Sequence, residues 1–139
     1  MPSRATPQQI DRAKRLLAHE GASGNAEACA LAAARVHDAI RAHLAPLVGD
    51  AGVQQLLVRS ATLTRAEFAF LEPGVVETST KLRECLQAQA PEVALGSAVA
   101  LYGTFFTLII TFIGERLTTQ VLSRAWPSIE RTPHQEPRK

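Results

Sequence analysis

Apolar residues recur every three or four positions through the first two-thirds of the sequence, a spacing that predicts amphipathic helices. A first helix is expected to begin at Pro7, because Thr6 is a good capping residue and proline suits the first helical position. A second is expected to begin at Ala26, after the capping residue Asn25. Pro46 should kink or close it, since proline removes a backbone donor and crowds the preceding turn.

The next two helices are bounded by turn-forming residues. A third helix is expected after Gly52, and Thr64 with Glu67 forms a capping box that predicts a restart of the helix there. The β-branched stretch 75–80 is the one place where a short extended segment is expected. Helical spacing then resumes and must end before Pro91, which disfavours helical geometry in the residue that precedes it.

Between positions 93 and 114 the sequence holds 22 residues without a charge. A helix of this length spans about 33 Å, enough to cross the hydrocarbon core of a bilayer. A helix that is apolar on all sides also suits the centre of a bundle, where the amphipathic helices need a partner for their apolar stripes. The sequence therefore favours a buried helix and leaves a membrane span as the alternative.

Small residues are arranged in rows along this uncharged helix. Gly103, Thr107 and Thr111 recur every four positions, and Gly96, Ala100 and Thr104 form a neighbouring row. Such rows let the backbone of another helix approach closely, in lipid or in a protein core. We therefore expect a helix-contact face made of Gly96, Ala100, Gly103, Thr107, Thr111 and Gly114.

The helix that begins at Pro91 is too long to stay straight inside a compact domain. Continued to Trp126, it would measure about 54 Å, whereas a globule of this size is about 37 Å across. The helix should therefore break at Gly114 or project from the domain. Beyond this point an amphipathic pattern, with Leu117 and Val121 on the apolar side, indicates packing against the same body.

Together these patterns predict an all-α protein, a bundle of about five helices around a long apolar C-terminal helix. The chain of 139 residues is long enough to bury a core without metals or disulfides. One helical domain is expected over residues 1–127. Residues 128–139 are polar and rich in proline, so a disordered tail is expected there.

Composition and charge narrow the classes of partner. With 46% apolar and 20% charged residues, the chain has the balance of a folded protein. A net charge of +2 is too small to indicate nucleic-acid binding. Asp11 and Glu20 reduce the positive charge of the first helix, which therefore does not indicate a nucleic-acid contact. Its basic residues, Arg12 among them, are expected to face solvent. Cys29 and Cys85 are expected to be buried, reduced thiols, which favours a cytoplasmic location. The first residues of the sequence contain no apolar run of the kind found in a secretory signal peptide, which favours the same location.

No catalytic, metal-binding or nucleotide-binding motif is recognised in the sequence, so neither an enzyme activity nor a cofactor is expected. Cys29 and His43 share a helix face but lie about 21 Å apart, too far to share a metal ion. Cys85 has no glycine-rich turn beside it to supply an oxyanion hole. Glu115, which follows the apolar helix, is a candidate polar contact that fixes register with a partner, or a proton-linked group near a membrane edge.

Two segments of the sequence resemble parts of uncharacterised small helical proteins of bacteria. The first is His43-Leu44-Ala45-Pro46-Leu47-Val48-Gly49. The second is Thr111-Phe112-Ile113-Gly114-Glu115-Arg116-Leu117-Thr118, which closes in Ser123-Arg124-Ala125-Trp126-Pro127. The resemblance implies a bacterial helical protein and carries no activity, ligand or partner with it.

Three functions are open at this point. The first is a non-enzymatic interaction protein that self-associates or binds a protein partner through the Gly/Thr face of helix 93–114. The second is a small membrane-anchored accessory protein that uses 93–114 as a single transmembrane span. The third is a bundle that holds an apolar ligand between its helices. The first is favoured, because the apolar stripes of the upstream helices suit a protein core.

Overall fold

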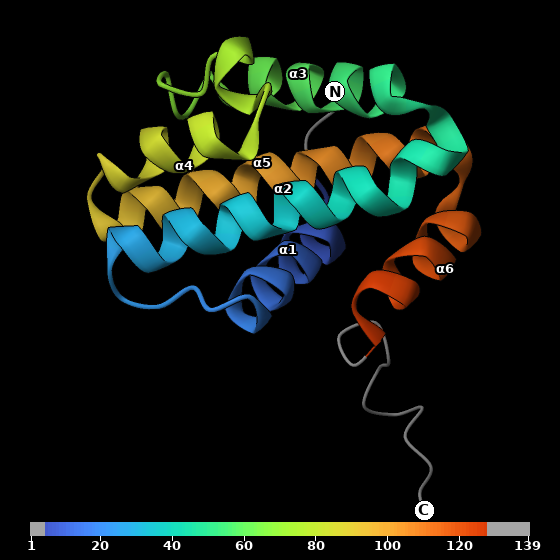
Figure 1. The fold of residues 1–139 in the computed structure, drawn as a ribbon, viewed down its shortest axis with the longest axis horizontal. Helices are drawn as coiled ribbons and strands as arrows, with labels where there is room; N and C mark the ends of the chain where they lie inside the picture. Colours follow the sequence, from blue (N-terminus) through green and yellow to red (C-terminus); the bar gives the residue numbers. More distant parts are fainter. Residues whose placement is uncertain (1–4, 128–139) are drawn as a thin grey trace, which may run out of the picture.

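The computed structural model describes residues 5–127, which form an all-α bundle (Figure 1). In chain order the elements are α1 (Pro7–His19), α2 (Ala26–Val48), α3 (Asp50–Thr64), the 3₁₀ helix η1 (Pro73–Val76), α4 (Ser79–Gln87), α5 (Pro91–Ile113) and α6 (Glu115–Ala125). No strand occurs in this part of the chain, which confirms the expected fold class. The tail expected over 128–139 lies outside the described residues.

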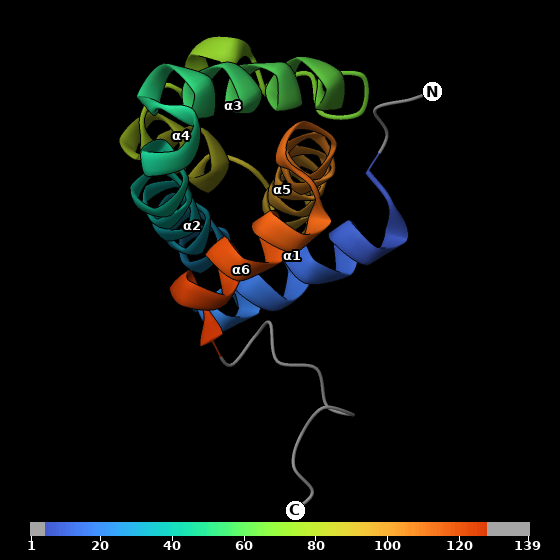
Figure 2. The ribbon, with the colours of Figure 1, turned by 90° about the vertical axis from the view of Figure 1, so that its right-hand side faces the viewer.

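The apolar helix α5 occupies the centre of the bundle. Figure 2 looks towards one end of α5 and shows α3 on one side of it, α1 on the opposite side and α2 beside it. α4 packs against α2, and α6 folds back towards α1 and α2. Among the described residues, α5 is the one helix long and apolar enough to cross a membrane, and 61% of its most apolar stretch is buried by the other elements.

Aromatic side chains of α5 form the middle of the core. Tyr102, Phe105 and Phe106 are fully buried, and Phe106 stacks on Tyr102 with ring centroids 6.5 Å apart. The Tyr102 hydroxyl donates a hydrogen bond of 2.6 Å to the carbonyl oxygen of Ala33 in α2. Burial raises the pKa of Tyr102 well above its ordinary value, and the negative charge of Asp38 adds to this effect.

The helix starts follow the capping residues expected from the sequence. The Thr6 side chain accepts a hydrogen bond of 3.3 Å from the backbone N–H of Gln9. The Asn25 side chain accepts one of 2.7 Å from the backbone N–H of Ala28. Thr78 caps α4 in the same way. Each cap satisfies a backbone donor that the first helical turn leaves unpaired, so the local sequence decides where these helices begin.

Between α2 and α4 the structure differs from the sequence expectations in three places. α2 ends two residues after Pro46, at Gly49 with φ +85°, as expected, but α3 begins at Asp50 and so includes Gly52, after which the sequence predicts its start. No helix restarts at Thr64, because its hydroxyl donates to the carbonyl of Ser60 at 2.9 Å and so belongs to the end of α3. The stretch 75–80 is not extended, since η1 and the capped start of α4 override the β-propensity of its side chains.

The expected break at Gly114 is confirmed. Its φ of +94° lies in the region that favours glycine, and the chain turns there from α5 into α6 (Figure 1). Val121 and Leu122 of α6 are buried. The indole N–H of Trp126 donates a hydrogen bond of 2.8 Å to the carboxylate of Glu20, which follows α1. α6 therefore closes over the bundle instead of projecting from it.

Arg12 of α1 is buried, although the sequence pattern places it on the solvent face. Its guanidinium donates to Oε1 of Gln9 at 2.8 Å and to Oγ1 of Thr119 at 3.5 Å. It also lies 6.0 Å from the ring centroid of Phe106, within reach of a cation–π interaction. The expectation fails because the Arg12 side chain reaches Phe106 of α5 and Thr119 of α6, and the sequence pattern of α1 alone contains no information about those contacts.

Candidate functional site

The centre of the predicted helix-contact face packs against α1 of the same chain. A Cβ atom built on Gly103 would lie 2.7 Å from Cδ1 of Ile10 and 3.3 Å from Cβ of Ala5, so a side chain there requires a shift. The Thr107 hydroxyl accepts a hydrogen bond from the backbone N–H of Thr6 at 3.3 Å and donates one to the Gly103 carbonyl at 2.9 Å. The close helix approach expected from the small residues therefore occurs within the chain.

The first part of this face, Gly96 and Ala100, lies towards the segment that follows α3. A Cβ atom built on Gly96 would lie 3.6 Å from Cζ of Phe68, an ordinary van der Waals distance. Ala100 lines a cavity between α1, α3 and α5. This part of the face is covered less tightly than Gly103.

The last part of the face is exposed. Phe112 is 65% exposed, and Thr111 and Gly114 on either side of it are exposed as well. Nothing lies within 4 Å of a Cβ atom built on Gly114. Leu117 of α6 is partly exposed, and α2, whose last turn carries the exposed Leu47, ends at the same end of the bundle (Figures 1 and 2). We call Thr111, Phe112 and Gly114 the exposed end of α5.

Glu115 lies in the first turn of α6, because the break at Gly114 starts a new helix before it. A carboxylate is stabilising at this positive end of a helix, whereas at the end of α5 it would face the negative pole. The side chain is exposed and pairs with no other described residue. The position of Glu115 is thus explained by the start of α6, where a carboxylate is favourable. In the chain, Glu115 directly follows the exposed end of α5.

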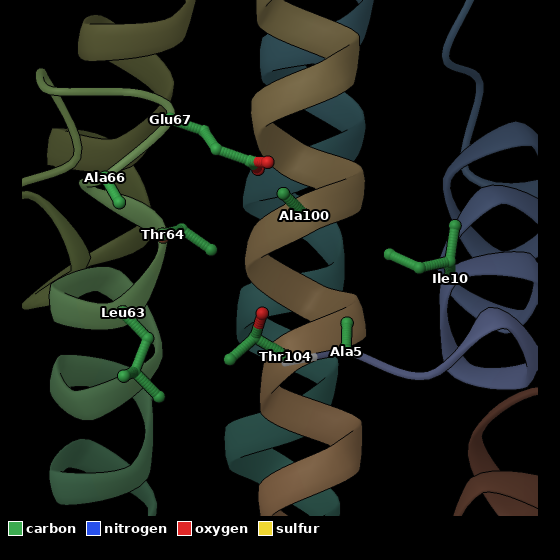
Figure 3. Close-up of a pocket in the computed structure, with 8 residues that line it drawn as sticks. All are labelled: Ala5, Ile10, Leu63, Thr64, Ala66, Glu67, Ala100 and Thr104. Carbon is green, nitrogen blue, oxygen red and sulfur yellow. The ribbon is translucent and has the colours of Figure 1, made fainter. Parts of the chain in front are cut away.

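A cavity of about 270 Å³ lies between α1, α3 and α5. Figure 3 shows the Glu67 carboxylate reaching over α5 beside Ala100, and the Thr104 hydroxyl pointing along α5 towards that carboxylate. Ile10 lines the cavity on the side of α1 and Leu63 on the side of α3. The sequence places Glu67 in a capping box and gives no signal for this arrangement, which only the packing of distant segments creates. The other lining residues are Ala5, Thr64 and Ala66.

No group of three His, Cys, Asp or Glu side chains that could hold a metal ion forms within residues 5–127. Cys29 is a buried free thiol that donates to the Ser23 carbonyl at 3.2 Å. Cys85 is a half-buried free thiol, and burial raises its pKa, which disfavours the nucleophilic thiolate.

Comparisons with protein-family models, curated proteins and solved structures give no match.

His37 of α2 is only 1% exposed, a placement that its neighbours in the sequence do not reveal. Its Nε2 atom lies 2.9 Å from the carbonyl oxygen of Val76, so the neutral ring donates a hydrogen bond there. Nδ1 has no hydrogen-bond partner in the described part of the chain. Burial lowers the pKa of His37, and the positive charge of Arg41 adds to this, whereas the bond to Val76 and the charge of Asp38 oppose it.

We expect the free energy of unfolding to fall as the pH drops below the ordinary histidine pKa of about 6.5. The unfolded chain takes up a proton there, whereas the folded protein, with its lowered pKa, keeps His37 neutral to a lower pH. Urea denaturation at about pH 7.5 and about pH 5.5 measures the loss. His37→Gln should reduce it and His19→Gln, at an exposed position, should not. An undiminished loss in His37→Gln would contradict the prediction.

Proposed function

We propose that this chain is a non-enzymatic helical interaction protein that pairs with a second copy of itself through the exposed end of α5. The observation that carries the proposal is Phe112, a large ring that is 65% exposed at the end of a mostly buried apolar helix. Aromatic side chains are enriched among the residues that dominate the binding energy of protein interfaces. Leu117, on the other side of the turn at Gly114, adds apolar surface.

The exposed end of α5 combines a large exposed side chain with a residue that has none. Phe112 projects, whereas Gly114 has no side chain and has open space around it. In a two-fold pair, each Phe112 ring can pack over the Gly114 backbone of the other copy, so that one surface complements itself. Thr111 leaves room for such an approach, because its hydroxyl is bonded to the Thr107 carbonyl at 3.0 Å. The part of the small-residue face that α1 leaves open thus suits self-association.

Sedimentation velocity over a range of protein concentrations tests this proposal. We expect a wild-type dimer, and we expect Phe112→Ser to weaken it about thirtyfold, because truncating a central interface aromatic costs about 2 kcal/mol. Leu95→Ser is the matched control, since Leu95 is also an exposed apolar residue of α5 but lies near its other end. A wild-type protein that stays monomeric at high concentration, or equal weakening by both changes, would contradict the proposal.

A small membrane-anchored accessory protein is the alternative, and one observation favours it. α5 has the length and the apolar composition of a single span, with residues 93–114 as the uncharged segment. To enter a bilayer, α5 must separate from the helices that now bury it. Carbonate extraction of isolated membranes distinguishes the two proposals. Retention in the extracted membranes supports the span, and recovery as a defined soluble dimer supports the interaction protein.

For the interaction protein we propose a cytoplasmic location. Cys29 and Cys85 are both free thiols, as expected in a reducing compartment. The proposed partner is protein and not nucleic acid, because the net charge is only +2 and acidic residues are interspersed with the basic ones.

A further inference from the structure

Thr104 of α5 is a buried polar residue on the wall of the cavity between α1, α3 and α5. It is only 5% exposed, and its hydroxyl makes no hydrogen bond to any residue that the structure describes. Thr107 and Thr111 in the same helix each donate to the carbonyl four residues back, at 2.9 and 3.0 Å, as helical threonines commonly do. The Thr104 hydroxyl points along the cavity instead (Figure 3). The hydroxyl oxygen therefore faces the open space of the cavity and can accept a hydrogen bond from a ligand there.

Glu67 brings a negative charge to the same cavity. It lies in the turn that follows α3, and Figure 3 shows its carboxylate over α5 beside Ala100. No lysine, arginine or histidine among the described residues forms an ion pair with it. Its two oxygens therefore remain free to accept hydrogen bonds from a ligand.

From these placements we propose that the cavity binds a small organic ammonium ion, whose nitrogen lies between the Glu67 carboxylate and the Thr104 hydroxyl. An ammonium group has three donors and no acceptor, which matches two oxygen acceptors on one side of a cavity. The rest of the ligand would pack against Ile10, Leu63 and Ala100, whose side chains are apolar. A bare metal ion would leave those apolar walls without a contact.

The size of the cavity limits the ligand. Sites for drug-sized molecules measure about 300–1,000 Å³, and this cavity, at about 270 Å³, lies just below that range. We therefore infer an alkyl or single-ring amine with about six carbon atoms. The site uses different residues from the exposed end of α5, so its test is independent of the proposed dimer.

An NMR titration of the ¹⁵N-labelled full chain with hexylammonium tests the proposal. We expect saturable shifts at the backbone amides of Glu67, Ala100 and Thr104, with a dissociation constant of about 1 mM, as is typical for so small a ligand. Hexanol has the same apolar chain without the charge, and it should bind about tenfold more weakly because the charge-assisted hydrogen bond is lost. Hexanoate should give no saturable shifts, because its charge repels Glu67.

Variants of near-identical shape assign the contacts. Glu67→Gln should weaken hexylammonium binding about tenfold, because it removes the charge and keeps the side-chain shape. Thr104→Val should weaken it about fivefold, and Thr104→Ser, which keeps a hydroxyl, should restore it. Glu72→Gln is the control, since it makes the same charge change at an exposed residue outside this cavity.

Four results would overturn the proposal. The first is equal binding of hexanol and hexylammonium, and the second is a set of shifts that lies away from the cavity. The third is an equal weakening of hexylammonium binding by Glu67→Gln and Glu72→Gln. The fourth is hexylammonium binding that is weakened by neither Glu67→Gln nor Thr104→Val. Because Glu67 is exposed, Glu67→Gln should retain the wild-type fold, and the dispersion of its NMR spectrum checks this directly.

Discussion

Gly103→Leu is expected to lower the free energy of unfolding by about 3 kcal/mol, a large share of the roughly 5–15 kcal/mol available to a small domain. Even a Cβ atom at this position would lie 2.7 Å from Cδ1 and 3.4 Å from Cα of Ile10. The side-chain tip can move, but the backbone atom moves only with α1. The larger side chain should therefore displace α1 and break the hydrogen bond between Thr6 and Thr107. Urea denaturation followed by circular dichroism measures the change.

Gly96→Ala provides the matched control in the same helix. A Cβ atom there makes an ordinary contact of 3.6 Å with Phe68, so alanine should stabilise the protein by up to about 1 kcal/mol through its helix propensity. Gly103→Ala should be less favourable than Gly96→Ala, and Ile10→Val, which removes Cδ1, should narrow that difference. Wild-type stability in Gly103→Leu would show that α1 does not pack on α5 as described.

Tyr102→Ala is expected to cost about 4 kcal/mol, because it empties the space of a fully buried ring that stacks on Phe106. It also removes the donor to the Ala33 carbonyl. Tyr102→Phe keeps the ring and loses only the hydroxyl, so about 1 kcal/mol should be lost in that variant. Denaturation of both variants separates the packing of the ring from its hydrogen bond. Equal losses in the two variants would rule out a large contribution from the ring.

Because of Tyr102, we also expect the free energy of unfolding to fall at alkaline pH. Its pKa is raised in the folded state, so the folded protein holds the phenol proton more tightly than the unfolded chain does. This contribution is present below about pH 10 and is lost as the pH rises above that value, where the unfolded chain ionises. Because Tyr102 is the only tyrosine, ultraviolet absorbance reports its ionisation without interference from another. The phenolate signal should appear together with unfolding; a signal from a still-folded protein would contradict the burial.

The features that could be predicted from the sequence are those that depend on neighbouring residues. Thr6 and Asn25 cap the helices that follow them, because a short side chain satisfies a backbone donor two or three residues away. The break at Gly114 follows from a glycine placed where a straight helix would outgrow the domain. The central position of α5 follows from its lack of charge, since a helix without a polar face must be covered.

The features that could not be predicted depend on residues far apart in the chain. Arg12 is buried because α6 brings Thr119 to it, across a separation of 107 positions. Rows of small residues predict a close helix contact but do not identify the partner, and at Gly103 that partner is α1. The cavity joins Glu67 and Thr104, which belong to different predicted features of the sequence. Local sequence patterns therefore predict the helices, whereas the candidate sites depend on which helices pack against each other.

The packing of α1 against α5 has a consequence for biosynthesis. α1 leaves the ribosome before α2, α3 and α4, whereas α5, against which α1 packs most extensively, is synthesised after them. At translation rates of about 5–20 residues per second, this delay lasts several seconds. Meanwhile α2, α3 and α4 can already pack against one another. For that interval the nascent chain carries an amphipathic helix whose apolar face is not covered by α5, a surface of the kind that chaperones bind.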